Sequence, residues 1–76
     1  MSSVLPVLSG RDVVKILSKA GWVESRLRGS HIILTKTGHI ASLSVPDHRE
    51  VARGTLQSLL RSASISVEEF VAMRRD

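Results

Sequence analysis

Hydrophobic residues recur at helical spacing in the segment that follows Ser9. Ser9 is suited to cap a helix, because Asp12 holds the capping-box position three residues later, and Gly21 is suited to end it. The apolar positions fall at i, i+3, i+4 and i+7, as on one face of an amphipathic helix: Val13, Ile16, Leu17 and Ala20. The pattern predicts a helix over residues 10–20.

The period of the hydrophobic pattern changes to two from Trp22 onward, which predicts β-strands. Three short strands are expected, near residues 22–27, 30–36 and 39–45. The pairs Arg28–Gly29 and Thr37–Gly38 supply the turns between them. Such connections are too short for parallel crossovers, so the strands are expected to form an antiparallel meander.

Alternation along each strand assigns its side chains to a core face or an open face. In the second strand Ile32 and Leu34 face the core, which leaves on the open face His31, Ile33 and Thr35. In the third strand the core face carries His39, Ala41, Leu43 and Val45, and the open face carries Ile40, Ser42 and Ser44. In the first strand Val23 and Leu27 point inward; the outward residues are Glu24, Arg26, Arg28 and, unless a twist at the strand end buries it, Trp22.

Two further helices are expected after Pro46 and a loop over residues 47–54. Thr55 is suited to cap the first of these, whose apolar face is Leu56, Leu59, Leu60 and Ala63. Ser66 and Glu69 form a capping box for the second, whose apolar face is Val67, Phe70 and Val71. The element order is αβββαα. This is an α+β fold, with one layer of helices on one face of a three-stranded antiparallel sheet.

The composition fits one small domain over residues 9–76, preceded by a short N-terminal extension at residues 1–8. The 76 residues include no cysteine, which excludes disulfides and thiolate metal sites, and the three scattered histidines do not make a zinc site. We therefore expect no metal and no cofactor. The apolar runs are far shorter than the roughly 20 residues that span a bilayer, so we expect a cytoplasmic protein with no membrane partner.

The positive charge is concentrated in one half of the chain. Residues 1–42 hold six basic and two acidic side chains, for a net +4, whereas residues 43–76 hold five of each. A one-sided positive field suits a polyanion such as RNA, although an ordinary solvated surface gives the same composition. Within the predicted first helix, a basic ridge steps by four residues through Arg11, Lys15 and Lys19.

The segment from Arg26 to His31 carries the residue types that RNA cleavage requires. Arginines can hold phosphate oxygens, a glycine lets a phosphate approach the backbone, and an imidazole can transfer a proton near neutral pH. Taken alone the pattern is weak, because an exposed histidine beside arginines is often an ordinary surface residue. His48 is interpreted as a loop residue, and no role is assigned to His39.

Four motifs occur in order along the chain: LPVLSGRDVVKILSKAGW, RLRGSHIIL, SVPDH and GTLQSLLRSASISVEEF. Together they resemble the HicA family of toxin ribonucleases, the mRNA interferases of bacterial HicA/HicB toxin–antitoxin pairs. The Gly-Ser-His triplet after basic residues is similar to the active-site signature of that family. The chain departs from many relatives at Ile32, where they carry a second histidine or a polar residue, and at Ser64, where glycine is common.

The resemblance implies a fold like that of a double-stranded-RNA-binding domain and metal-independent cleavage of mRNA, neutralised by a HicB-type antitoxin. It also implies that His31 is the catalytic residue. The expected RNA-binding residues are Arg26, Arg28, Gly29, Ser30, Lys36, Lys15 and Lys19. The second group that carries a proton stays open. Two other functions remain: a non-catalytic RNA-binding module, and a small subunit whose basic face meets an acidic protein.

Overall fold

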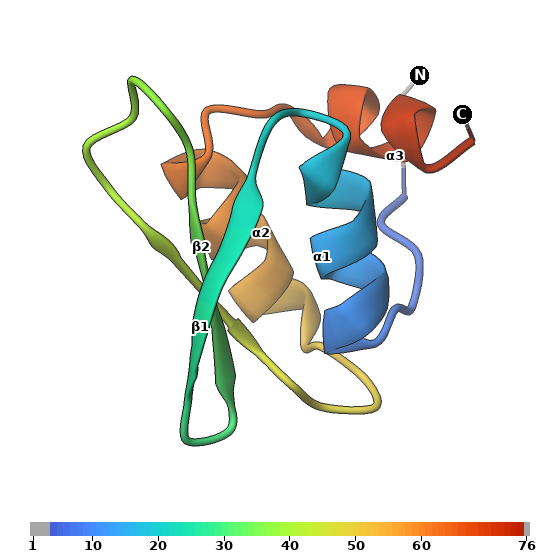
Figure 1. Ribbon diagram of the computed structural model, residues 1–76. Coiled ribbons are helices and arrows are strands. Elements are labelled where there is room, and N and C mark those ends of the chain that lie inside the picture. The colour runs from blue at the N-terminus through green and yellow to red at the C-terminus, as the bar shows by residue number, and fades with distance from the viewer. Residues whose placement is uncertain (1–3, 76) are drawn as a thin grey trace.

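The computed structural model describes residues 4–75, which form three helices and one three-stranded sheet (Figure 1). The elements are α1 (Gly10–Ser18), β1 (Val23–Arg28), β2 (His31–Thr35), β3 (Leu43–Pro46), α2 (Arg53–Ser62) and α3 (Val67–Arg75). The strands are antiparallel in the order β1-β2-β3, which confirms the predicted αβββαα fold. No helix in the described residues is long and apolar enough to cross a membrane.

The hydrophobic core lies between one face of the sheet and the helices (Figure 1). The sheet contributes the inward residues of β2 and β3, which are Ile32, Leu34, Leu43 and Val45. The helices contribute their predicted apolar faces, chiefly Val13, Ile16, Leu17, Leu56, Leu59, Leu60 and Phe70. Leu5 and Leu8, from the segment before α1, are buried in the same core. The other face of the sheet is therefore left open to solvent.

Local hydrogen bonds set both ends of α1. The Ser9 hydroxyl accepts from the Asp12 N–H at 3.1 Å, and the Asp12 carboxylate accepts from the Ser9 N–H at 3.3 Å, which is the predicted capping box. At the other end Gly21 adopts a φ of +97°, and the N–H of Trp22 donates to the Leu17 carbonyl. This turn directs Trp22 into the core, where it is 1% exposed. The helix ends at Ser18, two residues before the predicted end.

A β-bulge in β1 alters the predicted faces of that strand. The register pairs Glu24 with Leu34 and Arg26 with Ile33, which leaves Ser25 without a partner. Because partners across antiparallel strands share a face, Glu24 lies on the helix side and Val23 on the open side, and the predictions for both are wrong. Leu27 pairs with Ile32 on the core face yet is 57% exposed, because edge strand β1 is not covered by the helices there.

The third strand is shorter than predicted. It begins at Leu43, and the residues before it form a long loop. Leu43 and Val45 face the core as expected, whereas Ala41 is exposed in the loop. His39 also lies in the loop rather than on the core face of a strand, and its ring rests on Trp22 with centroids 4.8 Å apart. This aromatic contact holds the loop against the domain.

The second helix begins earlier and ends differently than its sequence suggests. It starts at Arg53 after Ala52, with no side-chain cap, so the prediction that Thr55 caps it is wrong. At its end Ser64 takes a φ of +59°, a left-handed conformation that favours glycine, while the Ile65 N–H donates to the Leu60 carbonyl. The serine therefore bears strain at a position suited to glycine.

Replacing Ser64 by glycine is expected to stabilise the fold by about 1 kcal/mol, because the left-handed backbone costs roughly that much for a residue with a side chain. Urea unfolding monitored by circular dichroism measures the change. The matched control is Ser62→Gly, inside α2, which is expected to destabilise by about 0.5 kcal/mol. An unchanged or lower midpoint for Ser64→Gly would contradict this account of the helix end.

The capping boxes of α1 and α3 make stability depend on acidic pH. In α3 the Glu69 carboxylate accepts from the Ser66 N–H at 2.9 Å, and the Ser66 hydroxyl accepts from the Glu69 N–H. Hydrogen bonds from the backbone and hydroxyl of Ser9 lower the pKa of Asp12, and those of Ser66 lower the pKa of Glu69. Since both pKa values are depressed on folding, the stabilisation is complete above about pH 5 and is lost as pH falls below about 4.

We therefore expect the double variant Asp12→Asn, Glu69→Gln to be less stable than the wild type at pH 7 and to approach it at pH 3. Urea unfolding at the two pH values tests this. Glu68→Gln is the matched control, because Glu68 lies in the same first turn of α3 outside the capping box. A constant difference between the double variant and the wild type at both pH values would be the contrary result.

Candidate functional site

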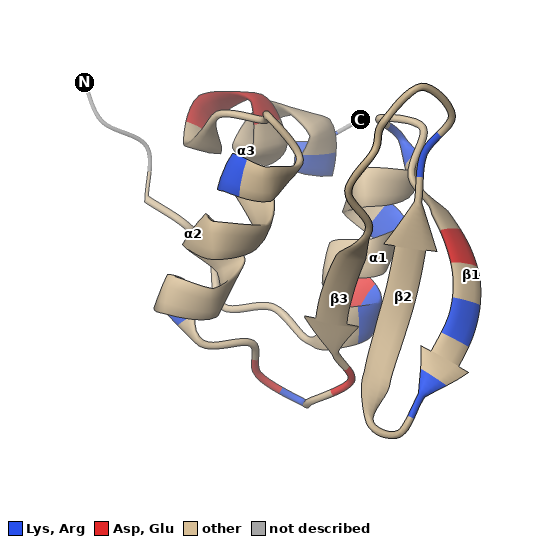
Figure 2. Ribbon diagram, turned by 90° about the vertical axis from the view of Figure 1, so that its left-hand side faces the viewer, with Lys and Arg blue, Asp and Glu red and all other residues tan. Residues whose placement is uncertain are grey.

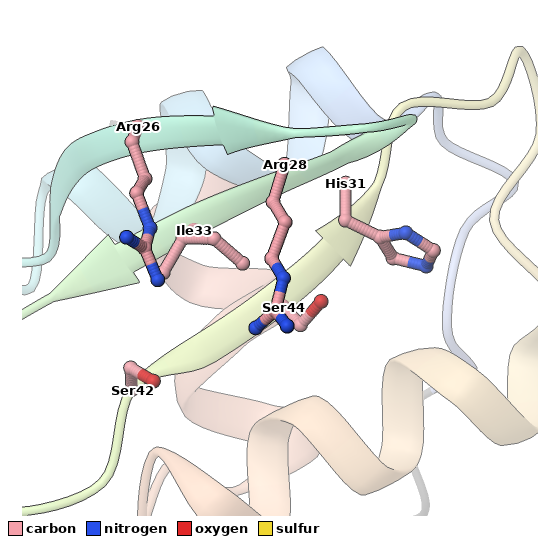
Figure 3. A pocket seen from close by; sticks show the side chains of 6 residues that line it. All are labelled: Arg26, Arg28, His31, Ile33, Ser42 and Ser44. Atoms are coloured by element: carbon pink, nitrogen blue, oxygen red, sulfur yellow. The ribbon is translucent and has the colours of Figure 1, made fainter.

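The open face of the sheet holds a cavity of about 330 Å³, and both arginines of β1 line it (Figure 3). The lining residues are Arg26, Arg28, His31, Ile33, Ser42 and Ser44. The strand register explains how they meet, since Arg26 pairs with Ile33, which pairs with Ser44. Arg28 pairs with His31 in the next row toward the turn. The predicted clustering of Arg26, Arg28 and His31 on one sheet face is thus what the structure shows.

The turn between β1 and β2 places His31 at the start of its strand. Gly29 has a φ of +61° at the first of two turn positions, as a type II′ hairpin turn requires. The Asp47 N–H donates to the Ser30 carbonyl at 2.7 Å and ties the turn to the end of β3. A Cβ built on Gly29 would meet nothing within 4 Å, so the turn backbone is open to an approaching ligand.

The side chains of Arg26, Arg28 and His31 form a row along strands β1 and β2. Figure 3 shows the guanidinium groups of Arg26 and Arg28 extending from β1 across the sheet toward β3, with the imidazole of His31 at the far end of the row from Arg26. His31 is solvent-exposed. Within residues 4–75 none of these three side chains forms an ion pair or a hydrogen bond. Their donors are available to a ligand.

No acidic side chain lines this cavity. Glu24, the acidic residue of β1, is bound by Arg11 of α1, with Nη1 and Oε1 3.0 Å apart on the helix side of the sheet. Arg11 Nε also lies 3.8 Å from the Asp47 carboxylate. The cavity is therefore a cationic surface whose charge the described residues leave unneutralised, and it suits an anionic ligand.

The other predicted RNA-binding cations lie away from the cavity. Lys15 belongs to α1, which packs behind the sheet, as Figure 2 shows. Lys19 directly follows that helix, and its Nζ donates to the Met73 carbonyl at 2.9 Å. Lys36 follows β2 at the end opposite His31, with its side chain beside Gly21. Contacts of these lysines with RNA stay predictions for a ligand that extends beyond the cavity.

The remaining histidines do not line the cavity. His39 rests on Trp22, and His48 lies in the loop after β3, where its carbonyl accepts from the Gly10 N–H. No group of three His, Cys, Asp or Glu side chains in residues 4–75 has the arrangement of a metal site. Ser42 and Ser44 were not among the predicted site residues, although their place on the open face by alternation could have indicated them.

The fold and the site define a small α+β domain that presents two arginines and a histidine on the open face of its sheet. Residues 10–65 match the family described as HicA toxin of bacterial toxin–antitoxin systems. The chain belongs to the HicA toxin family.

A solved structure supports this assignment. A chain of a toxin–antitoxin complex from Streptococcus pneumoniae is similar over 76% of this chain and 98% of its own length, with 27% identity and a TM-score of 0.69. A search of curated protein sequences gives no match.

Proposed function

We propose that this protein is the toxin of a type II toxin–antitoxin pair and acts as a metal-independent endoribonuclease that cleaves mRNA and blocks translation. The observation that carries the proposal is the pocket in which Arg26, Arg28 and His31 lie on one open sheet face without internal partners. Membership of the HicA toxin family supports it. Phosphodiester cleavage by a neighbouring hydroxyl requires a proton carrier and cations beside it, and these three residues supply both.

In the proposed mechanism the guanidinium groups of Arg26 and Arg28 hold the scissile phosphate over the sheet. The ribose 2′-oxygen attacks the phosphorus, and the bond to the 5′-oxygen of the next nucleotide breaks. His31 carries one of the two protons, either taking it from the 2′-hydroxyl or giving it to the leaving 5′-oxygen. The arginines stabilise the extra negative charge of the phosphorane. The products carry a 2′,3′-cyclic phosphate and a 5′-hydroxyl.

A HicB-type antitoxin is the proposed protein partner. The similar chain from Streptococcus pneumoniae belongs to a toxin–antitoxin complex, which supports an antitoxin for this protein. Ile33 is half-buried and lies between Arg26 and Arg28 on the open face (Figure 3), so it offers an apolar anchor beside the cations. An acidic antitoxin segment seated there would compete directly with RNA.

The proposed function is tested by incubating the purified protein with mixed-sequence RNA at low salt. The wild type is expected to fragment the RNA. The double variant Arg26→Ala, Arg28→Ala is expected to cleave it at least about 100-fold more slowly, because the scissile phosphate loses both of its cations. The control Arg74→Ala, Arg75→Ala removes the same charge from the last turn of α3. If both double variants lost the same factor in cleavage rate, the loss would be due to the lower net charge alone. That result would contradict a specific phosphate site.

The same fold and cations would also serve a non-catalytic RNA-binding module. Such a module would retain RNA in a salt-sensitive manner without cutting it. The exposed imidazole at the end of the arginine row favours the ribonuclease, because simple phosphate binding does not need a proton carrier there.

A further inference from the structure

A second cavity, of about 220 Å³, lies between β3 and α2. It adjoins the arginine–histidine pocket, because Ser42 and Ser44 line both. In Figure 3 these two serines lie between the arginine row and the neighbouring helix. A ligand held by the arginines would therefore reach the second cavity by crossing the outer edge of β3.

The second cavity is walled by hydroxyl groups from both elements. Thr55, Ser58 and Ser62 of α2 line it, and their spacing of three and four residues puts them on one face of the helix, opposite Ser42 and Ser44. All five side chains are exposed, and none forms a hydrogen bond within residues 4–75.

The floor of the cavity is apolar, and no charge opposes an anion. Leu43 and Leu59, which are 1% and 7% exposed, complete the lining. No acidic side chain lines either cavity. A hydroxyl group both donates and accepts hydrogen bonds, so it matches phosphate oxygens, which accept, and the ribose 2′-hydroxyl, which does both. An apolar floor accommodates the carbon face of a sugar or a base.

We propose that the cavity between β3 and α2 binds the ribose-phosphate of a nucleotide next to the scissile one, and that its hydroxyl groups recognise the 2′-hydroxyl. The site thus helps to hold RNA and to reject DNA. This inference rests on the proposed ribonuclease function and extends it from the scissile phosphate to the adjoining part of a single-stranded RNA.

A charge introduced into the cavity tests the site. Binding of a fluorescent single-stranded RNA is measured by anisotropy in a His31→Ala background, so that the RNA stays intact. Ser58→Glu is expected to weaken binding about tenfold, because the carboxylate would face the phosphate. The matched control Gln57→Glu adds the same charge to α2 outside the cavity lining and is expected to change binding less than about threefold.

Recognition of the 2′-hydroxyl is tested by combining changes in protein and RNA. A single 2′-deoxy substitution beside the scissile nucleotide is expected to weaken binding about fivefold when the cavity is intact. In the double variant Ser58→Ala, Ser62→Ala the same 2′-deoxy substitution should weaken binding clearly less than about fivefold, since two of the five hydroxyl groups that line the cavity are gone. An undiminished 2′-deoxy effect in that variant would overturn the assignment.

The outcomes separate this site from the function on which it rests. If the protein binds no RNA at low salt, both the ribonuclease function and the second site are wrong. If the wild type cleaves RNA and Ser58→Glu binds RNA as well as Gln57→Glu does, only the assignment of the second site is wrong. If Ser58→Glu blocks binding of a HicB-type antitoxin and leaves RNA binding unchanged, the cavity is a protein-docking surface and the RNA assignment is wrong.

Discussion

Replacing His31 by alanine is expected to slow RNA cleavage by about 10³-fold, the contribution typical of a positioned proton carrier. The fold should be unaffected, because the His31 side chain is exposed and makes no hydrogen bond within the described residues. RNA binding should fall only slightly, since Arg26 and Arg28 remain to hold the phosphate. Single-turnover cleavage, RNA affinity and the circular dichroism spectrum measure the three quantities separately.

The comparison for this prediction is His48→Ala, which removes an exposed histidine that does not line the pocket. It is expected to keep cleavage within about twofold of the wild type, as for a surface change away from the site. If His31→Ala cleaved RNA at the wild-type rate, the imidazole would have no part in the chemistry. The pocket would then be a phosphate-binding surface alone.

Replacing Gly10 by alanine is expected to destabilise the fold by about 3 kcal/mol, the upper part of the usual range for a side chain forced into filled space. Alanine normally favours a helix by about 1 kcal/mol over glycine. Here, however, a Cβ on Gly10 would overlap the carbonyl oxygen of Pro46, a backbone atom that cannot move independently. The Gly10 N–H also donates to the His48 carbonyl at 2.9 Å, so the two segments would have to separate.

This loss is a large share of the free energy of unfolding, which is expected to be roughly 4–11 kcal/mol for a domain of this size. It should also disturb the site, because Pro46 pairs with His31 and the next residue, Asp47, holds the Ser30 carbonyl. Urea unfolding measures the stability. The control is Gly54→Ala in the first turn of α2, where a Cβ meets nothing within 4 Å and a gain of about 0.5–1 kcal/mol is expected. Equal shifts for the two variants would contradict the steric account.

The parts of the fold that local chemistry determines were predictable from the sequence. Ser9 with Asp12 and Ser66 with Glu69 form the capping boxes that their spacing indicates. The alternation of Ile32 and Leu34 identifies the core face of β2. These features depend on neighbours within a few residues, so the sequence pattern contains them.

Features that depend on distant packing were not predictable. Nothing in the sequence of β1 marks Ser25 as a bulge, and that extra residue moves Glu24 to the helix side. The start of α2 at Arg53 lacks a side-chain cap, so no capping signal marks it. The spacing of Arg11, Lys15 and Lys19 shows that they share a helix face but not that α1 keeps them away from the pocket.

The candidate site was predictable in its centre but not in its extent. The turn at Gly29 fixes the alternation on either side of it, so Arg26, Arg28 and His31 fall on one face despite the bulge earlier in β1. The serines that widen the pocket toward α2 come from the third strand and the loop before it. Their meeting with the arginines depends on pairing of β2 with β3, which a turn motif does not encode.

The most direct test of the central claim is end-group analysis of RNA cut by the purified wild-type protein in excess EDTA at low salt. The account predicts fragments with a 2′,3′-cyclic phosphate and a 5′-hydroxyl, formed by the wild type and not by His31→Ala. Fragments with a 5′-phosphate and a 3′-hydroxyl, or cleavage that EDTA abolishes, would contradict it, because such products require attack by water rather than by the ribose 2′-oxygen, and such dependence requires a metal ion.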